Sequence, residues 1–245
     1  MNSWSRIRRW IWGALMLLVP VASLLIWRLF RMMASDDPAV WKREIAKFKE
    51  QDRHHSPLQG VIVFTGSSSI RFWQALEQDM APLPVINRGF GGAKINQVAY
   101  YADQIVIPYR PRAVVLFAGT NDLGSFNTKT AQEVFEGYVE FVKVVHAALP
   151  ETPIYYIAIT PTPSRWKAWS VARDANQRIK AYTETDPRLH FIDMTNEILG
   201  PDGRPKRDLY IQDRLHPSAK GYALWTSIIK PTLEADLLLR QESMQ

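Results

Sequence analysis

Short apolar runs alternate along the chain with longer segments in which apolar residues recur every three or four positions. The short runs are rich in β-branched residues and have the length of buried strands. They fall at 61–65, 84–87, 113–118, 154–160 and 189–193. Helical patterns lie at about 69–80, 94–106, 130–148 and 169–185, and a last one runs from Pro217 towards Leu239, where Pro231 predicts a kink. Strands that alternate with helices indicate an α/β domain with a parallel sheet covered on both faces.

The stretch from Val61 to Trp73, VIVFTGSSSIRFW, organises this pattern. Its apolar run predicts a strand, Thr65 and Gly66 interrupt the run, and three serines precede a helical pattern. Serines in this place lie at the carboxyl end of a strand and at the start of a helix, where ligands bind in open α/β sheets. A serine there can be a nucleophile, or it can be an ordinary helix N-cap.

The amino terminus carries an uncharged stretch of membrane-spanning length, from Trp10 to Trp27. A cleaved signal peptide is the alternative, but its apolar region spans about 7–15 residues and ends at a small-residue site. Here Arg28 and Arg31 intervene before the only such site, near Ala34. We therefore interpret residues 1–34 as an uncleaved membrane anchor formed by a transmembrane helix. A helix-start signal at Asp36–Pro38 then predicts a linker helix and loop over 35–59, and the main domain spans 60–245.

The formal net charge of +6 is concentrated in the anchor. Residues 1–34 hold five arginines and no acid, so the rest of the chain carries +1 and has no electrostatic reason to bind nucleic acid. Three of these arginines precede the apolar stretch and two follow it. The positive-inside rule then favours a cytoplasmic amino terminus and a single-pass protein whose domain is periplasmic or extracellular.

Polar and glycine-rich segments follow the predicted strands. NRGFGGAK covers 87–94, AGTND covers 118–122, and DRLHP covers 213–217 just before the last helix. Because the carboxyl ends of parallel strands share one edge of the sheet, the segments at 87–94 and 118–122 are expected to meet the serines of 67–69, and the loop at 213–217 can fold over them. Each segment alone has an ordinary interpretation as a turn, a helix cap or a helix-flanking loop.

Together these segments supply a complete set of groups for acyl transfer. A serine nucleophile needs a base, which His216 can provide, and Asp213, three residues earlier, can orient the imidazole. A tetrahedral oxyanion needs preorganised donors, and the candidates are the backbone N–H groups of Ser68 and Gly92 and the side-chain amide of Asn121.

The same segments resemble the motifs of the SGNH (GDSL-like) hydrolases over nearly all of residues 60–230. GSS at 66–68 resembles the first block, NRGFGG at 87–92 the second, GTND at 119–122 the third, and DRLH at 213–216 the last. The resemblance implies a flavodoxin-like three-layer α/β/α sandwich with a parallel five-stranded sheet, and esterase or lipase chemistry without metal or cofactor. It also puts Ser68 in the nucleophile position. One departure is visible, since the family usually has Asp where this chain has Ser67.

Three further residues are candidate substrate contacts. Arg88 lies near the glycine-rich turn, and Arg165 and Trp166 lie in the PTPSRWKAW stretch; solvated charges and a loop packed by its Trp are the alternatives. The expected substrate is a short-chain acyl ester, either a small molecule or an ester on a glycan or lipid.

Two other classes of function are alternatives to the hydrolase. The glycines at 89, 91 and 92 do not form a dinucleotide-binding G-x-G-x-x-G motif, and no phosphate-binding G-x-x-x-x-G-K-[ST] motif occurs. A membrane-anchored, non-catalytic binding module that retains the fold is the remaining alternative, motivated by Ser67.

Overall fold

The computed structural model describes residues 12, 23, 24, 27, 34–54, 59–124 and 128–242. The chain divides into two compact units, Met1–Ser35 and Asp36–Gln245. The predicted transmembrane stretch lies outside the described residues except at positions 12, 23, 24 and 27. Within the described positions, no helix is both long enough and apolar enough to cross a bilayer.

A five-stranded parallel sheet forms the centre of the second unit, and it confirms the predicted sheet. The strands are β1 (Ile62–Gly66), β2 (Val85–Gly89), β3 (Ala113–Phe117), β4 (Ile154–Ile157) and β5 (Leu189–Ile192). Their order is β2-β1-β3-β4-β5, which is the flavodoxin-like order. In such a sheet the direction of winding reverses between β1 and β3, and ligands bind at the carboxyl ends of these strands. In the register, Gly66 stands beside both Gly89 and Phe117.

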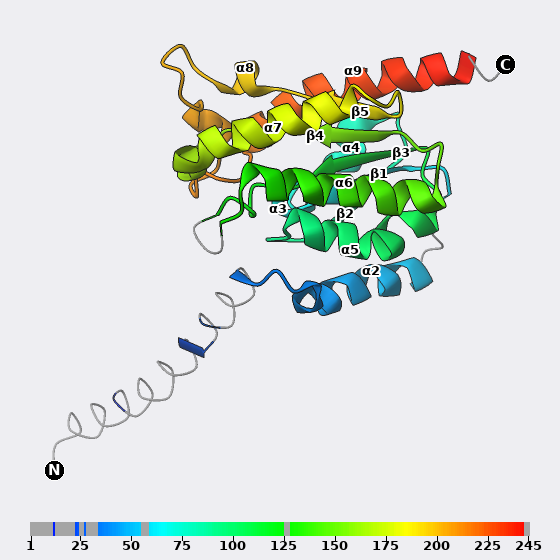
Figure 1. Cartoon of the computed structure of the whole chain (residues 1–245), viewed down its shortest axis with the longest axis horizontal. Coiled ribbons are helices and arrows are strands. Elements are labelled where there is room, and N and C mark those ends of the chain that lie inside the picture. The colour runs from blue at the N-terminus through cyan, green and yellow to red at the C-terminus, as the bar shows by residue number, and fades with distance from the viewer. Residues whose placement is uncertain are drawn as a thin grey trace, which may run out of the picture. The chain divides into compact units, whose positions relative to one another are not determined.

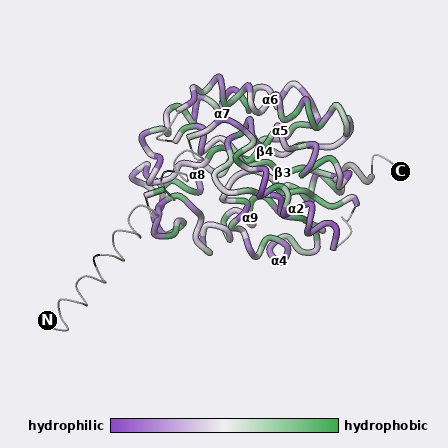
Figure 2. The backbone as a smooth tube through the Cα atoms, turned by 90° about the horizontal axis from the view of Figure 1, so that it is seen from below, coloured by the Kyte–Doolittle hydropathy of each residue, from purple (hydrophilic) through white to green (hydrophobic). Residues whose placement is uncertain are grey.

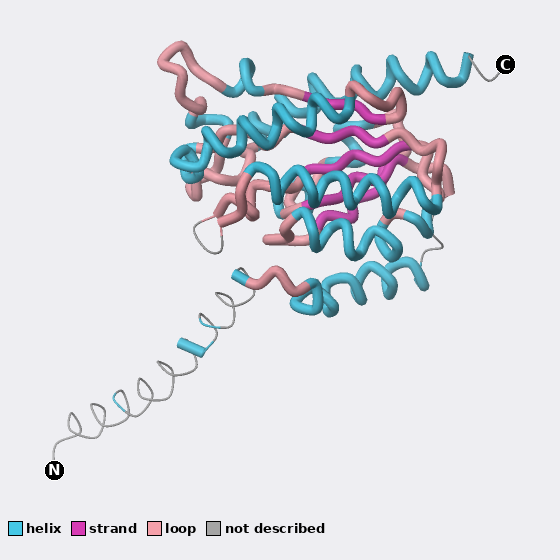
Figure 3. The backbone as a smooth tube through the Cα atoms, viewed as in Figure 1, coloured by secondary structure: helices cyan, strands magenta, loops and turns pink. Residues whose placement is uncertain are grey.

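Helices cover both faces of the sheet and complete the three predicted layers (Figures 1 and 3). One face carries α5 (Ile95–Ile105), α6 (Ala131–Ala148) and α7 (Trp169–Thr183), which pack side by side. The other carries α4 (Leu76–Met80) and α9 (Ala219–Glu242), with the short helix α8 (Thr195–Ile198). The helix α9 continues through Pro231.

The hydrophobic core on the α9 side is built around aromatic rings. Trp73 packs edge-on against Phe64 and Trp225, and Trp225 in turn contacts Phe117 of β3. Burying side chains of this size contributes roughly 1.5–3 kcal/mol each. In Figure 2 the strands β3 and β4 are largely green, whereas α2 and α4 carry purple stretches. The apolar strands therefore belong to the core. On α4, Leu76 and Met80 are buried, whereas Glu77 and Gln78 are exposed.

The helix expected at 69–80 is broken into two pieces, α3 (Ser68–Arg71) and α4. The side-chain amide of Asn87 donates to the carbonyl of Ile70 at 2.6 Å. In a continuous helix that carbonyl would accept from the N–H of Gln74, which here donates to Phe72 instead. A side chain from the neighbouring strand thus ends α3 after one turn.

Strand β4 ends at Ile157 although the apolar run continues to Thr160. The side chain of Asn176 in α7 bonds both the N–H and the carbonyl of Ile159, each at 2.9 Å. These two backbone groups are then unavailable for a sheet ladder, so the segment leaves the sheet.

The segment expected to be a linker is packed on the α/β unit. It forms η1 (Pro38–Trp41), which Asp37 caps, and α2 (Lys42–His54). Trp41 and Ile45 are almost completely buried, and α2 contacts α5. The remaining short elements are η2 (Ile107–Tyr109), η3 (Pro163–Ala168) and η4 (Arg207–Leu209).

Candidate active site

The turn after β1 has a backbone geometry that requires glycine. Gly66 has φ +132°, and a Cβ atom there would lie 2.0 Å from the carbonyl oxygen of Phe117. The next residue, Ser67, donates its N–H to that same carbonyl at 2.9 Å. The chain is therefore held tightly against β3 just before Ser68 begins α3, so the position of Ser68 is fixed by the sheet.

Ser68, His216 and Asp213 form a continuous chain of polar contacts. The Oγ atom of Ser68 lies 2.7 Å from Nε2 of His216, and Nδ1 of His216 lies 2.5 Å from Oδ2 of Asp213. Among the three consecutive serines, Ser68 is the one whose hydroxyl contacts the imidazole.

Backbone hydrogen bonds hold the loop that carries His216. The carboxylate of Asp213 accepts the N–H groups of Leu215 and His216 through Oδ1, at 2.8 and 3.0 Å. The hydroxyl of Tyr210 donates to the carbonyl of Pro161 at 2.5 Å, and the N–H of Ser164 donates to Arg214. The loop is thus attached to the segment that follows β4, which fixes the imidazole relative to the sheet.

The environment of Asp213 favours its charged form. Burial acts to raise the pKa of this carboxyl, but the hydrogen bonds from His216 and Leu215 outweigh burial and lower it. Asp213 therefore stays ionised under conditions in which it orients and stabilises a protonated imidazole.

Two backbone N–H groups near Ser68 are available to a ligand. In the described part of the chain, neither the N–H of Ser68 nor that of Gly92 donates to a protein acceptor. Gly92 has φ +77°, a conformation that favours glycine. The side-chain amide of Asn121 donates one hydrogen to the carbonyl of Ala93 at 3.0 Å, which ties Asn121 to the loop that carries Gly92.

The structure argues against Arg88 as a substrate contact. Its guanidinium is buried, and it donates to the hydroxyl of Tyr109 at 2.6 Å, to Asp52 at 2.6 Å and to the carbonyl of Asn87 at 2.9 Å. Its partner Asp52 belongs to α2, so this arginine joins α2 to the sheet edge. The strand pattern alone could not reveal a partner 36 residues earlier in the chain.

Arg165 and Trp166 line a surface hollow of about 590 Å³ together with Leu123 and Gly124. The guanidinium of Arg165 lies close to Gly124 in the loop that follows Asn121. Its Nη2 is 3.4 Å from the position that a Cβ atom on Gly124 would take. The ring of Trp166 lies under the guanidinium of Arg204 at 4.7 Å.

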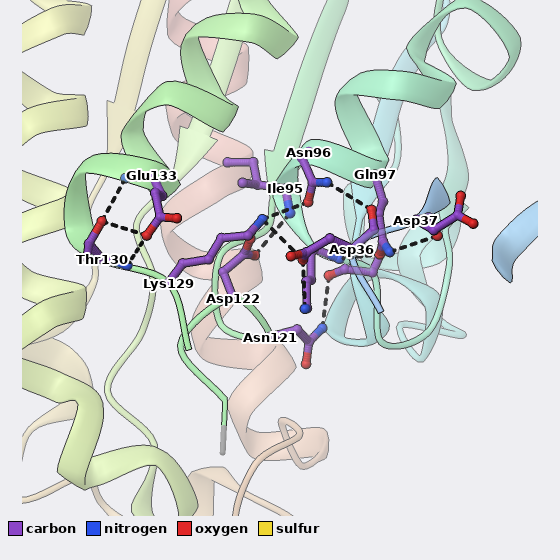
Figure 4. A network of polar contacts seen from close by, with 12 residues as sticks. Asp36, Asp37, Ile95, Asn96, Gln97, Asn121, Asp122, Lys129, Thr130 and Glu133 are labelled. Carbon is purple, nitrogen blue, oxygen red and sulfur yellow. Dashed lines mark hydrogen bonds and ion pairs between the residues drawn. The ribbon is translucent and has the colours of Figure 1, made fainter. Parts of the chain in front are cut away.

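Sequence reasoning missed several residues around this site. The ring of Phe72 packs edge-on against His216, with centroids 4.9 Å apart. Near the loop of Gly92, the side chains of Lys94 and Asp122 are buried. Asp122 pairs with Lys129 (Figure 4), and both Lys129 and Lys94 pair with Asp36. An Asp directly after Asn121 was the available signal, although its partners come from distant parts of the chain.

The described residues contain no group of three or more His, Cys, Asp or Glu side chains that could hold a metal ion.

The chain is similar to known proteins in sequence and in fold. The human platelet-activating factor acetylhydrolase IB subunit alpha1 is 29% identical over 171 residues, which cover 66% of this chain and 70% of the human protein. A solved structure from Streptococcus pneumonia superposes with a TM-score of 0.71 at 19% identity, over 88% of this chain and 99% of the other. A GDSL-like lipase from Bacteroides thetaiotaomicron gives 0.67 at 20% identity, over 78% and 98%.

The sequence profile of one family matches residues 56–224, which include Ser68, Gly92, Asn121, Asp213 and His216. This match spans more than half of the chain and confirms the resemblance drawn from its motifs. The chain belongs to the GDSL-like lipase/acylhydrolase family.

Proposed function

We propose that this protein hydrolyses a short-chain acyl ester, with Ser68 as nucleophile, His216 as general base and acid, and Asp213 as the residue that orients His216. The contact chain from Ser68 through His216 to Asp213 carries the proposal. Membership of an acylhydrolase family supports a reaction on an ester bond.

In the first step the Oγ of Ser68 attacks the ester carbonyl carbon while its proton passes to Nε2 of His216. The carbonyl oxygen becomes an oxyanion, and the protonated imidazole is stabilised by Asp213. Collapse of the intermediate breaks the bond to the alcohol oxygen, which takes the proton from Nε2. A water molecule then repeats the sequence on the acyl-serine, releasing the carboxylic acid and restoring Ser68.

The oxyanion is assigned to three donors, namely the N–H groups of Ser68 and Gly92 and the amide of Asn121. Among the described residues neither backbone group has a protein acceptor, which leaves both free for an oxyanion. The Asn121 nitrogen carries a second hydrogen besides the one given to Ala93, and we assign that hydrogen to the oxyanion.

The acyl group is proposed to be short, and acetyl is the first candidate. The human relative is named an acetylhydrolase, which supports this choice. We propose that Arg165 and Trp166 contact the alcohol part of the substrate, since their hollow adjoins the loop of Asn121. An aromatic ring can pack against a sugar, and a guanidinium group can bind an anionic lipid headgroup. Esters on a glycan and esters on a lipid are therefore both tested as substrates.

The amino-terminal stretch from Trp10 to Trp27 remains a proposed single-pass anchor, with a cytoplasmic amino terminus and an outward-facing domain. Its length, its terminal tryptophans and the arginines before it support this proposal. Membrane extraction of the full chain with carbonate, compared with a chain beginning at Asp36, tests it: the full chain should stay in the pellet and the shorter chain should not.

The first assay uses p-nitrophenyl acetate, butyrate and octanoate with the wild type, Ser68→Ala and His216→Ala. Turnover that falls with acyl length and disappears in both variants is expected. A folded wild type that turns over none of these esters, nor acetylated polysaccharide or lysophospholipid, would instead favour the non-catalytic binding module that Ser67 suggests.

A further inference from the structure

We propose that Trp41, in the segment that precedes the α/β sheet, is a positioning residue for the oxyanion hole, because it holds the backbone of Gly92 in place. The inference rests on the proposed function and adds to it a residue outside the matched family region, which begins at residue 56. Four observations support it.

The first observation is the direct contact of Trp41 with Gly92. A Cβ atom built on Gly92 would lie 3.2 and 3.3 Å from Cη2 and Cζ2 of Trp41. Leaving aside the chain neighbours of Gly92, no other described atom comes within 4 Å of that position. The indole is therefore the packing surface against this glycine, whose φ is +77°.

The second observation is that the indole itself is held on two sides. Its Nε1–H donates to Oε1 of Gln97 at 2.8 Å, and its ring packs edge-on against Phe90 with centroids 5.6 Å apart. The same Oε1 of Gln97 accepts the N–H of Lys94 at 3.0 Å. Trp41 is 4% exposed, so its ring is almost completely enclosed by its neighbours.

The third observation concerns the charge behind the loop. The ammonium of Lys94 is fully buried and pairs with Asp36 at 2.8 Å. Asp36 also lies 3.6 Å from Lys129, which pairs with the buried carboxylate of Asp122 at 2.9 Å (Figure 4). Oδ2 of Asp122 accepts the N–H of Ile95 at 3.0 Å. Ion pairs of Asp36 thus connect this segment to Lys94, which follows Gly92, and through Lys129 to Asp122, which follows Asn121.

The fourth observation is that a hydrogen bond links the loops that carry two of the assigned donors. Asn121 donates to the carbonyl of Ala93, the residue next to Gly92. A shift of the Gly92 backbone away from Trp41 would therefore disturb the N–H of Gly92 and the amide of Asn121 at once. Donors act on the oxyanion more than on the bound ester, so the expected loss is in kcat, and displacements of about 1 Å can cost about 100-fold.

The test compares Trp41→Ala and Trp41→Phe with Ile45→Ala in the full chain. Ile45 is buried in the same segment but lies more than 4 Å from the Gly92 position, so its truncation loosens α2 without removing the contact. Two readouts are used, kcat and KM on p-nitrophenyl acetate and amide hydrogen exchange of the peptide 89–94.

Trp41→Ala is expected to lower kcat about 10- to 100-fold, with KM changed less than about threefold, and to speed exchange at 89–94. Trp41→Phe keeps an aromatic surface and should recover part of kcat. Ile45→Ala should lower the Tm comparably but leave kcat and this exchange near wild type.

Equal effects of Trp41→Ala and Ile45→Ala on kcat and exchange would overturn the inference, since only general destabilisation would then be present. If the wild type were inactive on every ester, the proposed function would be refuted. If Trp41→Ala but not Ile45→Ala still sped exchange at 89–94, the role of Trp41 in holding the Gly92 loop would nevertheless be supported.

Discussion

The hydroxyl of Ser68 and the imidazole of His216 meet at 2.7 Å although 148 residues separate them in the chain. Ser68 follows β1, and His216 lies in the loop that Tyr210 and Ser164 attach to the segment after β4. The contact therefore depends on the whole sheet being assembled. It forms between two rigid supports, which is the preorganisation that nucleophilic catalysis needs.

Ser68→Ala is expected to abolish ester turnover, by about 10⁴-fold or more, because the attacking atom is lost. Labelling by a fluorophosphonate should disappear with it. Ser67→Ala and Ser69→Ala are the matched controls, since each removes a neighbouring hydroxyl, and both should keep the label. Labelling that survives in Ser68→Ala but not in a control would move the nucleophile to another serine.

Asn121→Ala is expected to lower kcat by about 10²–10³-fold with a small change in KM, because one oxyanion donor is removed. Steady-state kinetics on p-nitrophenyl acetate would measure this split. Asn96→Ala provides a control, since Asn96 lies in the neighbouring polar network and bonds Asp36 and Lys129 instead. A loss confined to KM would show that Asn121 binds the substrate without stabilising the oxyanion.

The sheet and the site could be predicted because their signals are local. The continuous apolar run from Val61 to Phe64 fits a buried strand or a buried helix segment. Because the run is too short for a helix, it indicates a strand. The motif residues of the first three segments lie at strand ends, and parallel strands bring those ends together without further information. The motif at 213–216 needs only a tight turn to join Asp213 and His216.

Features set by distant side chains could not be predicted. Asn87 ends α3 by taking the carbonyl of Ile70, and Asn176 ends β4 by bonding Ile159. Nothing in the local sequence distinguishes these two asparagines from other polar residues. Trp41 falls within the predicted linker helix, but nothing local indicated that its ring would pack against Gly92. In this protein, local patterns therefore predict the ends of helices and strands wrongly where a distant polar side chain bonds a backbone group.

Arg88→Met should reduce stability without affecting substrate binding. The substitution leaves the largely buried carboxylate of Asp52 without its cation, and losing one partner of such a pair costs about 3–5 kcal/mol. Denaturant unfolding would show this loss, while KM on neutral and anionic esters should stay within about twofold of wild type. Arg165→Met is the contrasting variant, for which KM should rise. A KM increase in Arg88→Met restricted to anionic esters would restore the sequence-based prediction for Arg88.

The pair of Asp186 and Arg188 should make stability depend on pH in the acid range. Hydrogen bonds from the Arg188 guanidinium and N–H lower the pKa of Asp186 to about 2. An unfolded chain has an Asp pKa of about 3.9, so the pair stabilises the fold above that pH and loses its contribution as the pH falls towards 2. Asp186→Asn should therefore lower the free energy of unfolding by about 1 kcal/mol at pH 7, with the difference shrinking between pH 4 and the acid limit of folding. Urea unfolding at several pH values measures this difference. Asp174→Asn is the control, because it breaks an ion pair with Arg178 in which both side chains are about half exposed. It should change the free energy of unfolding less. A difference for Asp186→Asn that is constant from pH 7 to pH 3 would show that the carboxylate contributes through its shape and hydrogen bonds rather than through its charge.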